Sequence, residues 1–268
     1  MIKALVSGAG GRMGGRIVVA LADQKEIALA GAFERRGHET VGQDAGVIAG
    51  TGTNGIPVVD RLELIVSSGD VIIDFTDPDA TLRHVGLAVE HGKAMVIGTT
   101  GMGAEQQEEL EKASRKIPIV FAPNTSVGVN LLFKVLADVA ATLGDAYDVE
   151  ITEIHHRYKK DAPSGTARKM GEVVAEALGR DPDEAIVSGR AGMVGERTEK
   201  EIGIFSLRGG DVAGEHTVTF AGLGERIEFT HRAHSRDTFA RGAVRAAMWI
   251  SGRVPGLYDM TDVLGLNK

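Results

Sequence analysis

The stretch Ser7-Gly8-Ala9-Gly10-Gly11-Arg12-Met13-Gly14 joins an apolar run, Ile2 to Ser7, to an amphipathic run, Arg12 to Ala22. From Gly8 onward it keeps a Gly-x-x-Gly-x-x-Gly spacing, one residue longer in the turn than the usual G-x-G-x-x-G motif. Such a turn lets backbone N–H groups approach a pyrophosphate, and the N-terminus of the following helix favours its negative charge. The stretch predicts a strand-turn-helix unit that binds a dinucleotide, with a purely structural turn as the alternative.

An acidic residue at the end of the next apolar run supports the dinucleotide interpretation. This run, Ile27 to Phe33, is followed by Glu34-Arg35-Arg36, about 20 residues beyond Gly14. An acid at this distance accepts hydrogen bonds from the adenosine ribose hydroxyls. Arg35 can stack on adenine or pair with a 2′-phosphate, and a solvated charge run at the end of a strand is the alternative.

Apolar runs alternate with helical patterns through the first half of the chain, which is typical of a parallel sheet wrapped by helices. The segment from Gly37 to Gly55 is rich in glycine and is interpreted as a long surface loop. The remaining predicted strands are Val71–Phe75, Ala94–Ile97 and Ile117–Ala122, and the remaining predicted helices are Asp60–Ser67, Pro78–His91 and Ala104–Arg115.

After about residue 125 the pattern changes, and strands follow one another without intervening helices. This succession indicates a mixed or antiparallel sheet in a second, smaller α+β domain. We therefore expect two domains, the first with a parallel sheet and the second beginning near residue 126. The predicted elements are helices Val127–Leu143, Gly165–Leu178 and Thr238–Ile250, the last able to pack on the first domain, and strands Val149–Ile154, Ile202–Leu207, His216–Phe220 and Ile227–His231.

Composition excludes several classes of function. The net charge is −7 and the sequence pI is about 5.7, which disfavours binding to nucleic acid or to anionic membranes. No uncharged apolar run approaches the roughly 18 residues of a membrane span, and no signal peptide is recognised, so we expect a cytoplasmic protein. The chain has no cysteine, which excludes disulfides, thiolate nucleophiles and cysteine-ligated metals.

Two further turns follow strands of the predicted parallel sheet: Gly98-Thr99-Thr100-Gly101 and Ala122-Pro123-Asn124-Thr125. Ligands of open α/β sheets bind beyond the carboxyl ends of the strands, so these turns are expected to border a nicotinamide ring. Ordinary turn chemistry also explains their composition.

The segment from Glu153 to Thr166 is a dense basic cluster in an acidic protein, with the sequence EIHHRYKKDAPSGT. It leads into a helix whose predicted N-cap is Ser164, so the N–H groups of Gly165 and Thr166 form an anion cradle. A basic wall and a helix N-terminus together suit a small substrate with two carboxylates. A solvated basic loop is the alternative.

Metal binding is not expected, because the paired histidines lack an H-E-x-x-H pattern and have only one nearby carboxylate after them, Asp161. His216, His231 and His234 lie on or beside predicted strands and are interpreted as structural or surface residues. Whether Arg236 and Asp237 form a surface pair or a hinge contact is left open.

Together these motifs, with Ser126-Val127-Gly128-Val129-Asn130, resemble the dihydrodipicolinate reductases (4-hydroxy-tetrahydrodipicolinate reductases) of bacterial lysine and diaminopimelate synthesis. The resemblance covers essentially the whole chain, and its most specific part is the segment from Glu153 to Ala167. It implies a Rossmann-type domain over residues 1–125 and 236–268 and a second domain over residues 126–235 that binds substrate and forms the oligomer. It also implies NADH or NADPH as hydride donor and a homotetramer.

The resemblance also implies roles for individual residues. His155 resembles the proton donor or acceptor and Lys159 a second proton donor, whereas His156, Gly165 and Thr166 resemble substrate ligands. The residues that resemble cofactor contacts are Gly8, Ala9, Gly10, Gly11, Arg12, Met13, Glu34, Arg35, Gly98, Thr99, Thr100, Ala122, Pro123, Asn124 and Thr125.

The sequence departs from the family pattern at two positions. Tyr158 replaces a frequent histidine, and Asp77 stands where members often have a basic residue near the adenosine. Asp77 would repel a 2′-phosphate, so we expect use of both cofactors with a preference for NADH. Two other hypotheses are a dehydrogenase for a different small acid and a non-catalytic redox-sensing module, which would not need clustered His and Lys.

Overall fold

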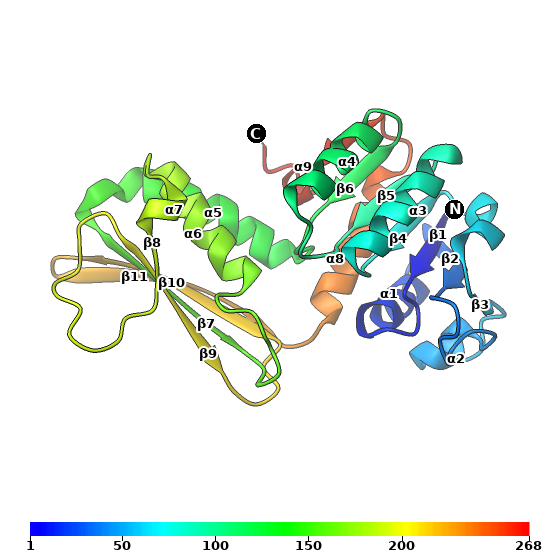
Figure 1. Cartoon of the computed structure of the whole chain (residues 1–268), viewed down its shortest axis with the longest axis horizontal. Helices are drawn as coiled ribbons and strands as arrows, with labels where there is room; N and C mark the ends of the chain where they lie inside the picture. The colour runs from blue at the N-terminus through cyan, green and yellow to red at the C-terminus, as the bar shows by residue number, and fades with distance from the viewer. Residues whose placement is uncertain (268) are drawn as a thin grey trace. The chain divides into compact units, whose positions relative to one another are not determined.

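The computed structural model describes residues 1–267, and the chain divides into two compact units (Figure 1). The first unit comprises Met1–Val127 and the segment that begins at Arg236, and the second unit comprises Gly128–Ser235. Each unit has its own sheet and its own hydrophobic core, so each is described by itself.

The first unit is built on a parallel sheet that, within the described residues, has seven strands in the order β12-β6-β5-β4-β1-β2-β3. β4 and β5 are fully buried, β1 is buried from Ala4 onward, and these strands are rich in Val, Ile and Ala, as the pattern predicted. Both edge strands were missed because they contain only two or three residues. The strands are β1 Ile2–Ser7, β2 Ile27–Phe33, β3 Val58–Val59, β4 Val71–Asp74, β5 Ala94–Ile97, β6 Pro118–Phe121 and β12 Gly256–Tyr258.

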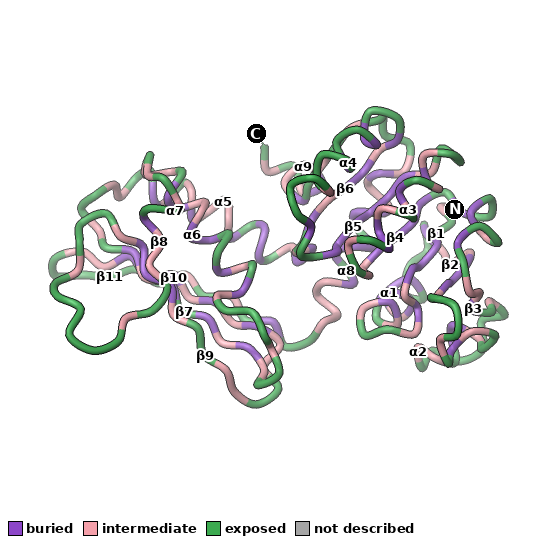
Figure 2. Tube along the Cα trace, in the orientation of Figure 1, coloured by how far each residue is buried: buried purple, intermediate pink, exposed green. Residues whose placement is uncertain are grey.

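Helices cover both faces of this sheet (Figure 1). α1 (Arg12–Ala22) and α8 (Asp237–Ile250) share one apolar core with the sheet, and α3 (Pro78–Glu90) and α4 (Ala104–Ser114) share the other. In Figure 2 the central strands are coloured mainly as buried, whereas buried and exposed residues alternate along the helices, as expected where one helix face packs on the sheet. The predicted helices Arg12–Ala22, Pro78–His91, Ala104–Arg115 and Thr238–Ile250 are thus confirmed, the last of them packing on the first domain as expected.

Two expectations for the first unit are wrong. The predicted loop from Gly37 to Gly55 contains a short helix, α2 (Ala45–Ala49), whose N-terminus is capped by the carboxylate of Asp44. The predicted helix Asp60–Ser67 is instead two 3-10 turns, Leu62–Leu64 and Val66–Ser68. Leu62 and Val66, four residues apart, are both buried, as their helical spacing predicts. The segment is nevertheless too short to form an α-helix.

The second unit packs α5 (Val127–Leu143) and α6 (Gly165–Ala177) on one face of a mixed sheet with strand order β11-β10-β7-β9-β8. β7 pairs with β9 in parallel and with β10 antiparallel, so the mixed sheet expected from the sequence is confirmed. The short β8 and α7 were missed. The bounds are β7 Asp148–His155, α7 Pro182–Ala185, β8 Ile186–Ser188, β9 Ile202–Arg208, β10 Gly214–Gly222 and β11 Glu225–Ala233, and the short helix α9 of the first unit spans Met260–Leu264.

Among the described residues, one helical stretch, Val127–Ala146, is long and apolar enough to cross a membrane. Leu132, Leu136 and Ala140 of this stretch are buried in the core of the second unit. Lys134 and Asp138 form an exposed ion pair on the same helix, as on the solvated face of a core helix.

Candidate active site

The glycine turn after β1 has a shape that only glycine permits at two positions. Gly8 has a φ of 61°, in the left-handed region, and its carbonyl accepts a hydrogen bond of 2.8 Å from the N–H of Gly11. A Cβ on Gly14 would lie 2.0 Å from the carbonyl oxygen of Gly8. No side chain caps the N-terminus of α1, so the turn presents backbone donors and the helix dipole.

Glu34 folds back onto this turn. Its Oε1 accepts a hydrogen bond of 3.1 Å from the N–H of Gly10, and its Oε2 accepts one of 3.2 Å from the N–H of Arg35. This position places an acceptor beside the turn, as a ribose-binding acid requires. Met13 turns its side chain into the hydrophobic core and Ala9 is buried, so only their backbones are free to face a ligand.

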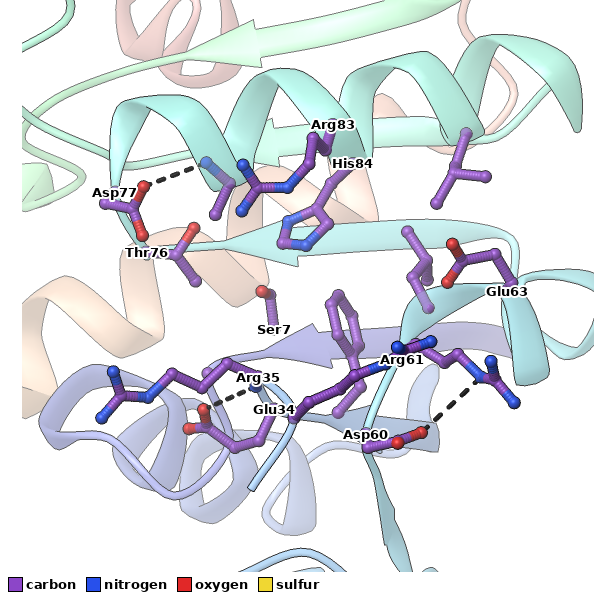
Figure 3. Close-up of a pocket in the computed structure, with 16 residues that line it drawn as sticks. Ser7, Glu34, Arg35, Asp60, Arg61, Glu63, Thr76, Asp77, Arg83 and His84 are labelled. Atoms are coloured by element: carbon purple, nitrogen blue, oxygen red, sulfur yellow. Dashed lines mark hydrogen bonds and ion pairs between the residues drawn. The ribbon is translucent and has the colours of Figure 1, made fainter. Parts of the chain in front are cut away.

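A cavity of about 610 Å³ opens beside Glu34 at the carboxyl ends of β1, β2 and β4 (Figure 3). Arg83 and His84 on α3 line it opposite Glu34 and Arg35 (Figure 3). Asp77 lines it as well, with its carboxylate accepting a hydrogen bond from the N–H of Ala80 at the N-terminus of α3. Residues of this cavity that the sequence analysis did not select include Arg36, Asp60, Arg61, Glu63, Arg83 and His84.

Helical spacing could have identified part of this set. Starting from the N-cap Asp77, residues Ala80, Arg83, His84 and Leu87 recur at intervals of three or four and share one face of α3. Arg61 offers no such signal, because it lies in an irregular segment after β3.

A buried carboxylate, that of Asp74, holds Thr76 and His84, two residues that line the cavity. Asp74, at the end of β4, accepts hydrogen bonds from the Oγ1 of Thr76 at 2.6 Å and of Thr81 at 3.2 Å, and its Oδ2 lies 2.5 Å from Nδ1 of His84. The Oγ1 of Thr99 also points into this cluster, 2.7 Å from that of Thr81. The side chain of Thr99 is therefore engaged in hydrogen bonds within this cluster, and its backbone is the part that can contact a cofactor. In the sequence, the acidic residue at the end of the apolar run Val71–Asp74 is the feature that indicates this polar cluster.

The two other predicted turns lie at the ends of the adjacent strands β5 and β6. Gly98 is packed against Phe75, whose ring would lie 2.0 Å from a Cβ at this position, and Thr100 is exposed. The Oγ1 of Thr125 donates a hydrogen bond of 2.7 Å to the carbonyl of Phe239, so this side chain ties the turn to α8. Asp237, whose role was left open, forms an ion pair with Arg16 that joins α8 to α1.

In the second unit, His155 ends β7 and is buried, with a residue exposure of 8%. Its Nδ1 lies 2.6 Å from Oε2 of Glu153, and its ring packs edge-to-face with that of His216 at a centroid distance of 5.2 Å. Burial, followed by the nearby charge of His155, lowers the pKa of His216 to about 3, so His216 is neutral at physiological pH. His216 is thus a structural residue, as interpreted from the sequence, and it also contacts the site: Glu153, His155 and His216 form one buried group, the His155 cluster.

The basic loop carries an internal ion pair that the sequence analysis did not assign. Nζ of Lys159 lies 2.8 Å from Oδ2 of Asp161, and the Lys159 side chain is 20% exposed. Burial raises the pKa of Asp161, but the hydrogen bond from Lys159 and the charges of Lys159 and Arg208 lower it overall. His156 is half-buried beside the loop.

The helix start predicted at Ser164 is confirmed. Its Oγ accepts a hydrogen bond of 3.1 Å from the N–H of Ala167 and lies 3.1 Å from Nε2 of His216. Gly165 is exposed, and a Cβ there would meet nothing within 4 Å, so the space before the first turn of α6 is open. A small anion can reach the backbone of Gly165 and Thr166 there.

A parallel sheet with a glycine turn and the acid Glu34 beside it, in a chain whose other unit has a buried histidine in a basic cluster, defines a Rossmann-type nicotinamide-dependent oxidoreductase. The family models "Dihydrodipicolinate reductase, N-terminus" and "Dihydrodipicolinate reductase, C-terminus" match residues 2–125 and 128–264. The chain belongs to the dihydrodipicolinate reductase family.

Individual relatives agree with this assignment over the full length of the chain. The 4-hydroxy-tetrahydrodipicolinate reductase of Syntrophus aciditrophicus is 54% identical over 268 residues, covering 100% of both chains. That of Geobacter sulfurreducens is 56% identical over 266 residues, covering 99% of this chain and 100% of the relative. A dipicolinate-bound dihydrodipicolinate reductase from Paenisporosarcina sp. TG-14 has 26% identity and a TM-score of 0.75, with 98% of each chain covered.

Proposed function

We propose that the chain reduces 4-hydroxy-tetrahydrodipicolinate to tetrahydrodipicolinate with NADH or NADPH, a step of lysine and diaminopimelate biosynthesis. The observation that carries the proposal is the buried His155 cluster within the segment from Glu153 to Ala167, the most specific motif of the family. Full-length identity of 54% to a 4-hydroxy-tetrahydrodipicolinate reductase supports it.

The first unit holds the cofactor, and its residues fit a dinucleotide. The turn excludes side chains at Gly8 and Gly14, and Glu34 and the cavity beside it suit the adenosine half. When bound, the reduced nicotinamide supplies the hydride. The proposed contacts are Gly8 to Met13, Glu34, Arg35, Gly98 to Thr100 and Ala122 to Thr125, with Met13 and Thr99 acting through their backbones.

The second unit holds a flat dicarboxylate. Lys159 and His156 attract one part of the dianion, and the backbone of Gly165 and Thr166 at the start of α6 binds another. The dipicolinate-bound relative carries a ligand of this chemistry. The protein contributes chiefly by positioning this substrate.

His155 donates the proton that accompanies reduction. A histidine suits this task because its ordinary pKa, near 6.5, is close to the pH of the cytoplasm. Lys159 is a second donor. We place the enzyme in the cytoplasm as a homotetramer, with residues 1–125 and 236–268 for the cofactor and 126–235 for substrate and assembly, and light scattering tests the oligomer.

The test is to titrate the purified protein with NADH, NADPH and the aldol product of pyruvate and aspartate semialdehyde, following the absorbance of the reduced cofactor. We expect cofactor oxidation that depends on the aldol product. Oxidation with another small oxo acid alone would favour a different dehydrogenase, and cofactor binding with no turnover would favour a redox sensor.

A further inference from the structure

Glu153 is a buried carboxylate to which the family comparison gives no role. Its side chain has no exposed surface, and it receives hydrogen bonds from His155, Arg208, Ser206 and the N–H of Ser164. Oε2 is bonded to Nδ1 of His155 at 2.6 Å and to Nη1 of Arg208 at 2.8 Å. Oε1 is bonded to Nη2 of Arg208 at 3.0 Å and to the N–H of Ser164 at 3.1 Å.

These contacts keep Glu153 ionised. Burial raises the pKa of Glu153, but the hydrogen bonds from His155 and Arg208 lower it to about 2. An ionised carboxylate only accepts hydrogen bonds, so the shared proton of the 2.6 Å contact belongs to Nδ1 of His155. Within residues 1–267 no protein group is bonded to Nε2 of His155, which leaves that nitrogen for a ligand.

The fold brings Arg208 to Glu153 and His155 from a distant part of the sequence. Arg208 is the register partner of His155 across the parallel pair β7 and β9. The same guanidinium donates a hydrogen bond of 2.7 Å to the carbonyl of Asp161, which ties the basic loop to the cluster. The ring of His155 is confined further by Gly214, where a Cβ would lie 2.9 Å from Nε2.

We propose that Glu153, held by Arg208, is the positioning residue of His155: it fixes the ring and its Nδ1–H tautomer so that Nε2 exchanges the proton with the substrate. This inference rests on the proposed function and adds a residue to it. When Nε2 of His155 takes up a proton from water before each turnover, the Glu153 carboxylate stabilises the resulting imidazolium, and donation from Nε2 to the substrate restores the neutral ring.

The substitution Glu153→Gln tests this because it keeps the shape and removes one acceptor. The new NH₂ group must face either Nδ1 of His155 and Nη1 of Arg208, or Nη2 of Arg208 and the N–H of Ser164, all of which donate in the native chain. We expect kcat to fall roughly 10- to 100-fold, part of what a positioned acid contributes, with substrate KM changed less than about threefold.

A matched control is Glu150→Gln. Glu150 lies on the same strand and also pairs with arginines, Arg190 and Arg197, but its partners are not those of His155. We expect wild-type kcat and KM for this variant. An equal loss of kcat in both variants would indicate a merely structural role and overturn the inference. So would a rise of substrate KM in Glu153→Gln as large as its loss of kcat.

The tautomer is read directly by ¹⁵N NMR of the histidine-labelled full-length protein. We expect Nδ1–H for His155 in the wild type and a shift toward Nε2–H in Glu153→Gln. An Nε2–H signal in the wild type refutes the inference even where the variant does not fold. A wild-type protein inactive on the aldol product refutes the proposed function instead, whereas an active wild type with undiminished kcat in Glu153→Gln refutes only this inference.

Discussion

The glycine turn of the first unit is shaped by backbone alone, whereas His155 in the second unit is held by side chains from several elements. At the turn, close approach of Gly14 to the carbonyl of Gly8 sets the conformation, and every group involved lies within eight residues. Around His155, Glu153 and Arg208 are 55 residues apart and meet only when β7 pairs with β9. A site made from adjacent backbone can be recognised in a sequence, but one made by strand pairing cannot.

The largest effect is expected from a change at the backbone-defined site. In Gly14→Ala the new Cβ would lie 2.0 Å from the oxygen of Gly8, so the turn must move, and we expect NADH affinity to fall roughly 100-fold or more. Gly15→Ala is the matched control, because the nearest atom to its Cβ is 3.8 Å away. Isothermal titration of both variants measures this, and equal NADH affinities would show that the turn tolerates a side chain.

The basic loop offers the next test. Each charge-assisted contact contributes about 1.5 to 3 kcal/mol, so a monocarboxylate analogue should bind roughly 10- to 150-fold more weakly than pyridine-2,6-dicarboxylate. Lys159→Ala should raise the inhibition constant of the dicarboxylate and make it less sensitive to salt, whereas the exposed Lys160 gives a control variant without this effect. If both analogues inhibit equally and Lys159→Ala changes nothing, the loop is only a solvated surface.

The buried His155 cluster predicts a dependence of stability on pH. The unfolded chain protonates His216 near its ordinary pKa of 6.5, but the folded chain does so only near 3, so the free energy of unfolding falls as the pH drops below 6.5. The expected slope is on the order of 1 kcal/mol per pH unit. Above about pH 5.5 Glu153 is ionised in both states and adds little slope of its own, and between about pH 5.5 and 4.5 its slope has the same sign as that of His216.

Urea unfolding between pH 6.5 and 4.5, followed by circular dichroism, measures this slope. His216→Asn should reduce it, and His91→Asn, a change at an exposed histidine of the first unit, should leave it as in the wild type. Burial also lowers the pKa of His231, so a part of the slope remains in the His216 variant. A slope unchanged by His216→Asn would mean that this ring is not kept neutral by the fold.

The smallest effect concerns cofactor preference. We expect both cofactors to be used with a higher kcat/KM for NADH, because Asp77 lines the cavity beside Glu34 that we propose for the adenosine half. Asp77→Asn keeps the helix cap and should raise the relative kcat/KM for NADPH by roughly 2- to 5-fold. Asp79→Asn removes a charge from the same helix turn without altering the cavity lining, and should change the ratio less. A wild-type preference for NADPH would show that Arg83, Arg61 and Arg36 outweigh Asp77.

The fold was predictable where periodicity and glycine spacing are strong. β1, α1 and β2 have the bounds expected from the sequence, and so does α5. The edge strands β3 and β12 were not predictable, because two or three residues carry no periodicity and pair only through their neighbours. The capped helix α2 was hidden among glycines that end and follow it.

The candidate site divides in the same way. The segment containing His155, Lys159 and Gly165 was recognisable as a motif. The residues that surround it in space were not, because they come together only when β7 pairs with β9. In the sequence Arg208 is one more charged residue at the end of a strand. The pairing of β9 with β7 places it beside Glu153. Arg83 could be placed at the cavity only once the inward face of α3 was known. That the side chain of Thr99 is engaged in hydrogen bonds could be known only from the buried position of Asp74.

The central claim, that this chain reduces the dicarboxylate substrate with a proton from His155, is tested most directly by the steady-state turnover of His155→Gln. Gln keeps much of the volume and hydrogen bonding of the imidazole but cannot donate a proton in this way. We predict a fall in kcat of roughly 100-fold or more, with NADH affinity near that of the wild type. Wild-type turnover in His155→Gln would contradict the account.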